Sequence, residues 1–338
     1  MMQKDSLLGK TIEELRNIST ELDNPIFLGN QLAHWLYKSN VPGYEGMNNI
    51  SKVNRAMLAE RYLTGLQSPE KVQESKDGTK KYLFRVSGNR FVEAAYIPEK
   101  DRATLCLSTQ VGCKMGCLFC NTGKQGFQGN LSAGEIINQY RMLPEREKIT
   151  NIVYMGMGEP LDNYEHVKKS LEIFTSTWGF GMSPRRITVS TIGILPATRD
   201  FILDNECHLA VSLHTPFNEE RKKIMPVETV SPIQEVVEEI KNHDFGGQRR
   251  VSFEYIMFEN FNDTQAHAKQ VAQLLNGLKC RINLIRYHQI PGISMKGSSP
   301  EKIQAFKDLL NQKKILTTIR ASRGEDILAA CGLLSTRC

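Results

Sequence analysis

The sequence predicts an α/β fold built on a parallel sheet, open or curled into a barrel, with a small helical module before it. Two observations favour this fold. From about residue 100 onward, strand-like runs alternate with helical stretches, which is typical of parallel sheets. Before that point, short helices precede two strand-like runs. The chain has 338 residues, 40% of them hydrophobic, which is enough for one large α/β domain with an appendage or for two domains.

Residues 1–95 are predicted to form the accessory module. Thr11 and Glu14 have the spacing of a capping box, which predicts that a helix begins there. Periodicity predicts two more helices and a strand pair, around 32–36, 57–62, 82–86 and 92–96. The module is either a scaffold or an RNA-docking element, and the sequence leaves both interpretations open.

Residues 96–338 are predicted to form the larger domain. Its expected strands are 104–108, 151–155, 186–191, 208–213, 250–257 and 281–286, and its expected helices are 132–144, 163–176, 232–242, 264–276 and 300–312. In parallel sheets, functional side chains gather in the loops after the carboxyl ends of the strands. The most informative motif of the chain directly follows the first of these strands.

That motif is C-x3-C-x2-C, formed by Cys113, Cys117 and Cys120. A 4Fe–4S cluster normally takes four protein thiolates, so three leave one iron open to a small molecule. The spacing fits radical S-adenosylmethionine (SAM) chemistry, in which SAM chelates that iron through its amino and carboxylate groups. The alternative is a zinc knuckle, but zinc sites usually pair two such cysteine units, and no second pair follows here. We therefore expect a 4Fe–4S cluster.

Polar residues at the ends of three further strands predict a cofactor pocket. Gly158 lets the backbone approach a ligand closely, and the Glu159 carboxylate suits the ammonium group of SAM. Ser190 ends the third strand, and Ser212 and His214 end the fourth. Each of these three residues alone could cap the following helix. Together with Glu159, they are expected to line a SAM pocket at one rim of the sheet.

Two cysteines and one carboxylate are singled out by their surroundings. Cys331 is flanked by small residues, so a substrate could reach its sulfur, and Cys106 shortly precedes the cluster motif. Taken singly, each is typical of a buried apolar cysteine. Glu93 lies in an otherwise apolar strand, where it either faces solvent by alternation or is held for proton transfer.

The charge pattern favours a polyanionic partner. The net charge is +6, and from Lys279 to Arg323 ten Lys and Arg residues accompany only two acidic ones, a local +8. A charge run is usually a solvated face, but here Tyr287, His288 and Phe306 interleave with it. This combination suits RNA.

The eight cysteines also bear on the compartment. No export signal is visible, so these thiols are expected to serve as ligands or catalysts in a reducing compartment, the cytoplasm. No apolar run approaches the roughly 18 residues of a membrane span. Cys207 and Cys280 are expected in the core, and the terminal Cys338 is expected to be mobile.

The assembled pattern resembles the radical SAM RNA adenine methyltransferases, the RlmN/Cfr family. The matching stretches are 102–106, 108–113, 117–120, 122–123, 125–127, 130–131, 156–160, 212–214, 323–324 and 329–332. They cover the chain from about residue 90, and the N-terminal module matches more loosely. A generic radical SAM enzyme needs neither Cys106 nor Cys331, so the resemblance is specific.

The resemblance implies a partial (β/α)6 radical SAM barrel with a small N-terminal helical accessory domain. It implies a 4Fe–4S cluster on Cys113, Cys117 and Cys120, and SAM contacts from Gly158, Glu159, Ser190, Ser212, Leu213 and His214. Cys331 would carry a methyl group, Cys106 would resolve the intermediate, and Glu93 would accept a proton. His288 stands where many members have asparagine, and a histidine can still donate a hydrogen bond to SAM.

The implied reaction methylates ring carbon C2 of an adenine in 23S rRNA and of a tRNA adenine near the anticodon. C2 is electron-poor, so direct transfer from SAM fails. One SAM would methylate the Cys331 thiolate, and a second would supply a radical that activates this methyl group for addition to adenine. Cys106 would then attack Cys331, form a disulfide and release the product. The cycle uses two SAM per turnover and a reducing electron donor such as flavodoxin or ferredoxin.

Two alternatives are carried forward. Methylation of adenine C8, the antibiotic-resistance branch, shares every motif, and no residue separates it from C2 methylation. C2 is preferred because that branch is far more widespread. A non-catalytic Fe–S RNA-binding protein is less consistent with the sequence, because pure binding requires neither Cys106 nor Cys331.

Overall fold

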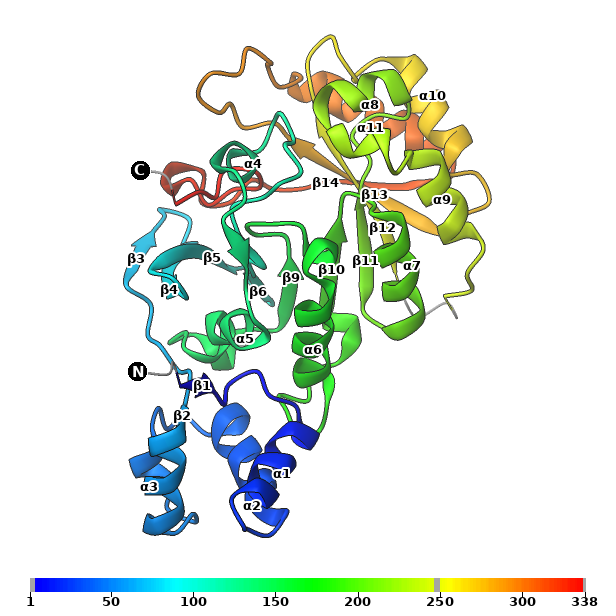
Figure 1. The fold of residues 1–338 in the computed structure, drawn as a ribbon. Coiled ribbons are helices and arrows are strands. Elements are labelled where there is room, and N and C mark those ends of the chain that lie inside the picture. Colours follow the sequence, from blue (N-terminus) through cyan, green and yellow to red (C-terminus); the bar gives the residue numbers. More distant parts are fainter. Residues whose placement is uncertain (1–3, 246–249, 337–338) are drawn as a thin grey trace.

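A ten-stranded sheet organises the larger part of the chain (Figure 1). The computed structural model describes residues 4–245 and 250–336, and Cys338 lies outside them. In sheet order the strands are β14 (Leu316–Ile319), β13 (Cys280–Arg286), β12 (Val251–Met257), β11 (His208–Ser212), β10 (Ile187–Thr191), β9 (Asn151–Tyr154), β6 (Ala103–Cys106), β5 (Arg90–Pro98), β4 (Lys80–Val86) and β3 (Lys71–Glu74). Strands β6 and β9 to β14 pair in parallel, and β3 to β5 extend the sheet in antiparallel fashion.

The parallel part of the sheet confirms the six predicted strands and adds a seventh. All seven residues of β12 are buried, which is typical of a strand covered on both faces. The unpredicted strand is β14, which pairs with β13 at the edge of the sheet. It has four residues and an exposed Leu316, so its sequence carries little strand signal of its own.

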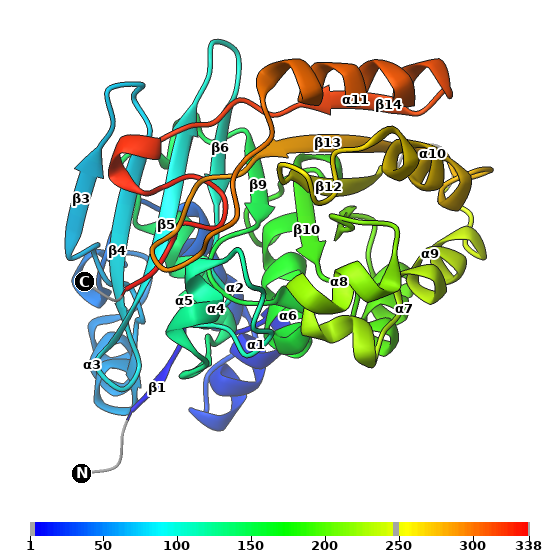
Figure 2. The ribbon, with the colours of Figure 1, turned by 90° about the horizontal axis from the view of Figure 1, so that it is seen from above.

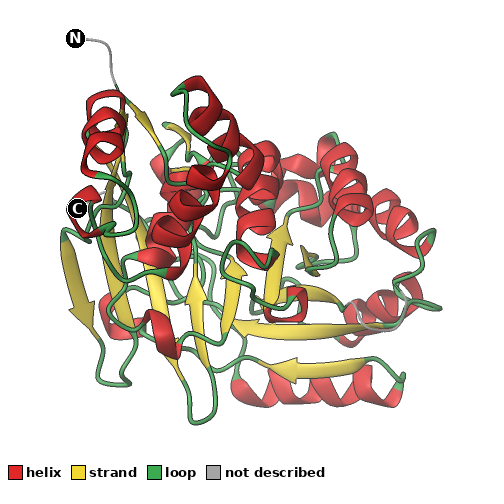
Figure 3. Ribbon diagram, turned by 90° about the horizontal axis from the view of Figure 1, so that it is seen from below, coloured by secondary structure: helices red, strands yellow, loops and turns green. Residues whose placement is uncertain are grey.

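Helices connect the parallel strands and lie around the outside of the curved sheet (Figure 3). They are α5 (Ala133–Arg141), α6 (Tyr164–Thr175), α7 (Leu195–Asp204), α8 (Asn218–Ile224), α9 (Ile233–Lys241), α10 (Gln265–Leu274) and α11 (Pro300–Gln312). The five predicted helices of this domain correspond to α5, α6, α9, α10 and α11. Sequence periodicity missed α7 and α8; α8 has only seven residues, most of them charged.

The N-terminal module is helical, as expected. It consists of α1 (Ile12–Glu21), α2 (Phe27–Ala33) continuing into a π-helical turn (His34–Lys38), and α3 (Lys52–Arg61), with β1 (Asp5–Ser6) paired to β2 (Tyr62–Leu63). The predicted capping box at Thr11 and Glu14 is present. The module contacts the larger domain through α6, where Lys169 pairs with Glu14 at 2.7 Å.

The predicted strand pair joins the large sheet. β4 and β5 form a hairpin whose turn places Gly88 and Asn89 at positive φ, as hairpin turns of this kind require. β5 then pairs with β6, with Ala95 opposite Cys106. The division of the chain at residue 95 stays a prediction, since β5 spans that position.

The sheet curls into an open barrel. Seen from above, β4 to β6 run across the direction of β13 and β14, and the chain after β14 returns toward β5 and the loop near α4 (Asn121–Gln125) (Figure 2). This returning segment, residues 320–336, closes the open side of the barrel. Within the described residues, every helix is too short or too polar to cross a membrane.

Candidate active site

The loop that follows β6 carries the three cysteines of the predicted cluster site. The short strands β7 (Gln110–Val111) and β8 (Gly129–Asn130) close its base. Gly112 has a φ of +71°, and a Cβ there would lie 1.7 Å from the carbonyl oxygen of Gly126, so the tight loop requires glycine. Cys117 and Cys120 pack against an apolar cluster. The loop therefore holds the cysteines beyond the carboxyl end of β6.

The three thiols are close enough to interact electrostatically. Burial raises the pKa of Cys113 to about 12, with Cys120 adding to the effect. Burial, Cys120 and Cys113 raise the pKa of Cys117 well above its usual value, and Arg221 opposes this. Buried thiolates so placed need a positive centre, which an iron–sulfur cluster supplies.

The cysteines do not form a ready-made site for a single metal ion. Among residues 4–245 and 250–336, no three His, Cys, Asp or Glu side chains converge closely enough to hold one metal ion. In a 4Fe–4S cube each iron occupies its own corner, so the thiolates that bind it are spread apart. The three cysteines on this loop stay the predicted ligands of such a cluster.

Glu159 lies buried beyond the end of β9. Its Oε1 accepts a hydrogen bond from the amide of Leu161 (3.1 Å), and its Oε2 accepts one from the amide of Ile192 (3.0 Å). Burial raises the pKa of this carboxyl to about 7. Gly158 precedes it at φ +97°, where a Cβ would lie 2.5 Å from that of Gln110. A ligand ammonium group would stabilise the charged form of such a carboxyl.

The predicted serines lie on neighbouring strands of the same sheet face. Thr188 of β10 and His208 of β11 line the cavity inside the barrel. Side chains alternate along a strand, so Ser190 and Ser212 are on that same face, nearer the carboxyl ends. Leu213 follows directly and is fully buried.

His214 is held in one orientation. It is buried at a φ of +55°, its Nδ1 accepts a hydrogen bond from the amide of Ile256 (3.0 Å), and its ring meets the edge of Phe119. Burial, together with Arg221, lowers its pKa to about 3. The ring is therefore neutral at physiological pH and offers ligands an uncharged nitrogen.

Arg221 anchors this rim and was not predicted from the sequence. Its guanidinium donates hydrogen bonds to the carbonyls of Ile192 (2.7 Å), Ser212 (2.8 Å) and Leu213 (3.2 Å). It also pairs with Glu228, and both side chains are completely buried. One side chain thus connects the ends of β10 and β11. An arginine in the charged run of α8 gives no sequence signal of this role.

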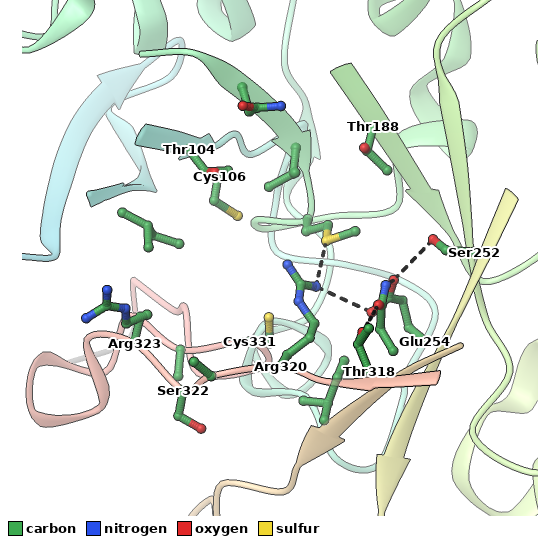
Figure 4. Close-up of a pocket in the computed structure, with 18 of the residues that line it drawn as sticks. Thr104, Cys106, Thr188, Ser252, Glu254, Thr318, Arg320, Ser322, Arg323 and Cys331 are labelled. Atoms are coloured by element: carbon green, nitrogen blue, oxygen red, sulfur yellow. Dashed lines mark hydrogen bonds and ion pairs between the residues drawn. The ribbon is translucent and has the colours of Figure 1, made fainter. Parts of the chain in front are cut away.

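Cys106 and Cys331 line the same cavity, which has a volume of about 540 Å³ (Figure 4). Cys106 comes from β6 and Cys331 from the returning segment, so tertiary structure brings the two together. Burial, and then Cys331, raise the pKa of Cys106 to about 12, while Arg320 opposes the shift. Cys331 is the exposed member of the pair. His288 lines this cavity too, whereas Glu159, Ser190 and Ser212 are outside its lining.

The segment carrying Cys331 docks on the helix that follows the cluster cysteines. The amide of Asn121 donates to the carbonyl of Gly332 (2.8 Å), and the Thr122 hydroxyl donates to that of Leu334 (2.7 Å). Asn121 follows Cys120 directly. The position of Cys331 is therefore coupled mechanically to the cluster loop.

Glu93 is buried rather than exposed. Its Oε1 lies 3.0 Å from Lys81 Nζ, and its Oε2 accepts a hydrogen bond from the amide of Ser335 (3.0 Å). Burial raises the pKa of Glu93, while Lys81 opposes the rise. Of the two interpretations left open by the sequence, solvent exposure is thus excluded. Its role in proton transfer stays a prediction.

The basic stretch does not form one surface. Arg281, Arg320 and Arg323 line the cavity. His288 contacts Ser322 (3.1 Å) and Glu325 (3.1 Å) within the returning segment. Part of the local charge therefore faces the inside of the barrel, a distribution that the sequence could not reveal.

Comparison with known proteins supplies the family. Residues 107–271 match the Radical SAM superfamily, and residues 6–63 match the ribosomal RNA large subunit methyltransferase N-terminal domain. A protein of Parabacteroides distasonis named a probable dual-specificity RNA methyltransferase RlmN is 53% identical over 99% of this chain and 98% of its own length. The dual-specificity RNA methyltransferase RlmN of Syntrophus aciditrophicus is 40% identical, over 99% and 97% of the two chains.

A solved structure agrees with these matches. A radical SAM methyltransferase from Sphaerobacter thermophilus superposes with a TM-score of 0.92 at 37% identity, and the match covers 98% of this chain and 99% of that one. The fold expected from the sequence, a partial radical SAM barrel with an N-terminal helical domain, is confirmed. The chain belongs to the RlmN family of radical SAM dual-specificity RNA methyltransferases.

Proposed function

We propose that this enzyme uses SAM to methylate ring carbon C2 of an adenine in 23S rRNA and of a tRNA adenine near the anticodon. One observation carries the mechanism. Cys106 and Cys331, which simple SAM chemistry does not need, line one cavity, and the Cys331 segment is bonded to the helix after the cluster cysteines. That arrangement supports a protein-bound methyl group.

The cofactor site is assigned to the loop after β6 and the rim beside it. Cys113, Cys117 and Cys120 would hold a 4Fe–4S cluster, and Gly158, Glu159, Ser190, Ser212, Leu213, His214 and His288 would contact SAM. A cluster held there would supply an electron for the reductive cleavage of SAM, and SAM would supply both the methyl group and the 5′-deoxyadenosyl group. We propose two SAM per turnover, because the methyl group and the radical come from separate molecules.

Residues of the chain itself carry the methyl group, accept the proton and release the product. The Cys331 sulfur accepts the methyl group by polar displacement, for which the thiolate is the competent form. Its exposure suits that step. After the carbon has joined the adenine ring, the adduct loses the one electron that SAM cleavage consumed and the ring proton, which Glu93 accepts, and the ring becomes aromatic again. Lys81 beside Glu93 favours the ionised form that can accept this proton. Cys106 then releases the product by attacking the Cys331 sulfur.

RNA binding is assigned to two parts of the chain. The helical N-terminal module, within residues 1–95, would dock RNA, and those basic side chains of 279–323 that lie outside the cavity lining would contact phosphates. Affinity should therefore fall steeply with salt, because phosphate contacts release counterions. The electron donor would be a flavodoxin or ferredoxin. Ribosomal RNA and tRNA are cytoplasmic, and we assign the enzyme to that compartment.

The deciding experiment is mass spectrometry of adenosines from a strain lacking this gene. Loss of 2-methyladenosine from both 23S rRNA and tRNA, with recovery on complementation, is the expected result. Loss of 8-methyladenosine instead would establish the resistance-type reaction. Unchanged methylation with retained RNA binding would identify a non-catalytic Fe–S protein.

A further inference from the structure

Product release requires Cys106 to lose its proton, and the surroundings of this thiol disfavour the loss. A thiol must be deprotonated to attack sulfur. Cys106 is only 8% exposed on β6, and burial disfavours its charged form, as does Cys331 nearby. Some group in the cavity must therefore compensate the developing negative charge.

Arg320 is placed to do this. It follows β14 and points into the cavity that Cys106 and Cys331 share (Figure 4). Its Nη1 lies 3.3 Å from Glu254 Oε2 and 3.4 Å from Met155 Sδ. Contacts with the Glu254 carboxylate and the Met155 thioether thus hold the guanidinium in the cavity that the two cysteines line.

A hydrogen-bonded network fixes Glu254 in turn. The Asn283 amide donates to Glu254 Oε1 (2.8 Å), and the Thr318 hydroxyl donates to Asn283 Oδ1 (2.7 Å). These residues come from β12, β13 and β14. The cation is therefore preorganised by three neighbouring strands rather than carried on a mobile side chain.

Resting on the function proposed above, we propose that Arg320 is a positioning residue for product release, which stabilises the Cys106 thiolate as it attacks Cys331. In that step a sulfur–sulfur bond forms between Cys106 and Cys331, and the bond from the Cys331 sulfur to the methylene carbon on adenine breaks. The electron pair of the broken bond passes to that carbon, which takes a proton from solvent and becomes the methyl group. The electrons balance without a further oxidant.

The other ionisable groups of the cavity do not substitute for Arg320. Of the groups that act on Cys106, Cys331 raises its pKa and Arg320 lowers it. Glu254 faces Arg320 from β12. Arg102 pairs with Glu99, Arg323 with Asp77 and His288 with Glu325. The cavity is also lined by Arg185, Arg250 and Arg281, and none of these three is among the groups that act on Cys106.

The first test needs no RNA. In a Cys331→Ala background, the rate at which iodoacetamide alkylates Cys106 is followed by peptide mass spectrometry from pH 6 to 10. Because burial raises the pKa of this thiol to about 12, the rate in this range is proportional to the thiolate fraction, and a displacement of the rate curve along the pH axis gives the shift of the Cys106 midpoint. Arg320→Gln should shift the midpoint upward by about one unit or more, which is about tenfold less thiolate at a given pH. Arg185→Gln removes a positive charge that lines the same cavity but is not among the groups that act on Cys106, so it should leave the midpoint unchanged.

A second variant is expected to shift the Cys106 midpoint in the opposite direction. Glu254→Gln keeps the shape of the side chain and removes the charge that partly neutralises Arg320. The Cys106 midpoint should then move downward, which a merely structural role for the network would not produce. If Arg320→Gln fails to fold, this variant alone decides the proposal, and an unchanged or raised midpoint overturns it.

The catalytic readout uses RNA. Single-turnover reactions of otherwise native enzyme, resolved on denaturing gels, measure the lifetime of the RNA–protein adduct. Arg320→Gln should prolong the adduct lifetime about tenfold near pH 7. The lifetime should return toward the wild-type value as the pH rises, because a higher pH restores the Cys106 thiolate. A prolonged lifetime that does not respond to pH overturns the proposal. If wild-type enzyme and Cys106→Ala form no adduct at all, the proposed function fails, while the alkylation result still judges Arg320.

Discussion

Arg221 and Glu228 form an ion pair in which both side chains are completely inaccessible to solvent. The same guanidinium donates hydrogen bonds to three backbone carbonyls at the ends of β10 and β11. The pair thus combines a structural role with the shaping of the rim assigned to SAM. Removing one member would leave the other as a buried, uncompensated charge.

Arg221→Met should therefore lower the free energy of unfolding by about 3–5 kcal/mol, the usual result of breaking a buried pair. Urea unfolding measured by circular dichroism would show the change as a lower midpoint. The adjacent Lys222 has a solvent-exposed partner, Glu219, so Lys222→Met is the matched control and should not move the midpoint. Equal midpoints for the two variants would contradict the assigned role of Arg221.

Replacing Cys113, Cys117 and Cys120 together by alanine should abolish cluster binding and SAM cleavage. Anaerobic reconstitution followed by absorbance spectroscopy and chromatographic assay of 5′-deoxyadenosine measures both. Cys280→Ala, which removes a partly buried thiol on β13, should retain both activities. Continued formation of 5′-deoxyadenosine by the triple variant would rule out the cluster assignment.

Cys106→Ala should accumulate as a covalent complex with RNA. The addition to adenine does not require this thiol, but the attack that frees Cys331 does. Denaturing electrophoresis of purified variant, with and without ribonuclease, detects the linked species. Normal turnover with no linked RNA would show that Cys106 is only a core residue of the sheet.

Deuterium labelling tests the role of Cys331. Enzyme stripped of preloaded methyl and supplied with SAM bearing a deuterated methyl group should place two deuteriums and one solvent hydrogen in the new methyl group, and one deuterium in 5′-deoxyadenosine. This follows because a hydrogen atom is removed from the Cys331 methyl before transfer. Mass spectrometry of both products gives the count. Three retained deuteriums would indicate direct transfer from SAM.

Glu159 should make SAM binding depend on pH. Burial raises its pKa to about 7, so the carboxyl is increasingly protonated below neutral pH and then attracts an ammonium group less. Calorimetry on reconstituted enzyme should show affinity falling as pH drops from 8 to 6, by at most about tenfold per unit. Glu159→Gln should bind weakly and lack this dependence; a variant with the wild-type pH profile would exclude Glu159 as the group responsible.

Local patterns in the sequence predicted most of the regular structure. The capping box at Thr11, the strand pair at 82–86 and 92–96 and the strand–helix alternation depend on neighbouring residues, so they are visible without the fold. β14 was missed because a four-residue edge strand forms only where β13 offers an unpaired edge. α8 was missed because it is short and mostly charged, and its buried side chains, Arg221 and Ile224, do not form an apolar stripe.

The sequence by itself predicted the chemistry: the cysteine spacing predicts a cluster with an open iron, and two additional cysteines predict a protein-bound intermediate. Only the tertiary structure decided which residues work together. Cys106 and Cys331 are far apart in the chain and meet because the segment after β14 crosses the open side of the barrel and hydrogen-bonds to α4. Arg221 and Arg320 likewise acquire their roles from carbonyls, carboxylates and thiols contributed by distant elements. Such long-range contacts form when apolar surfaces pack, and the spacing of residues along one chain does not encode them.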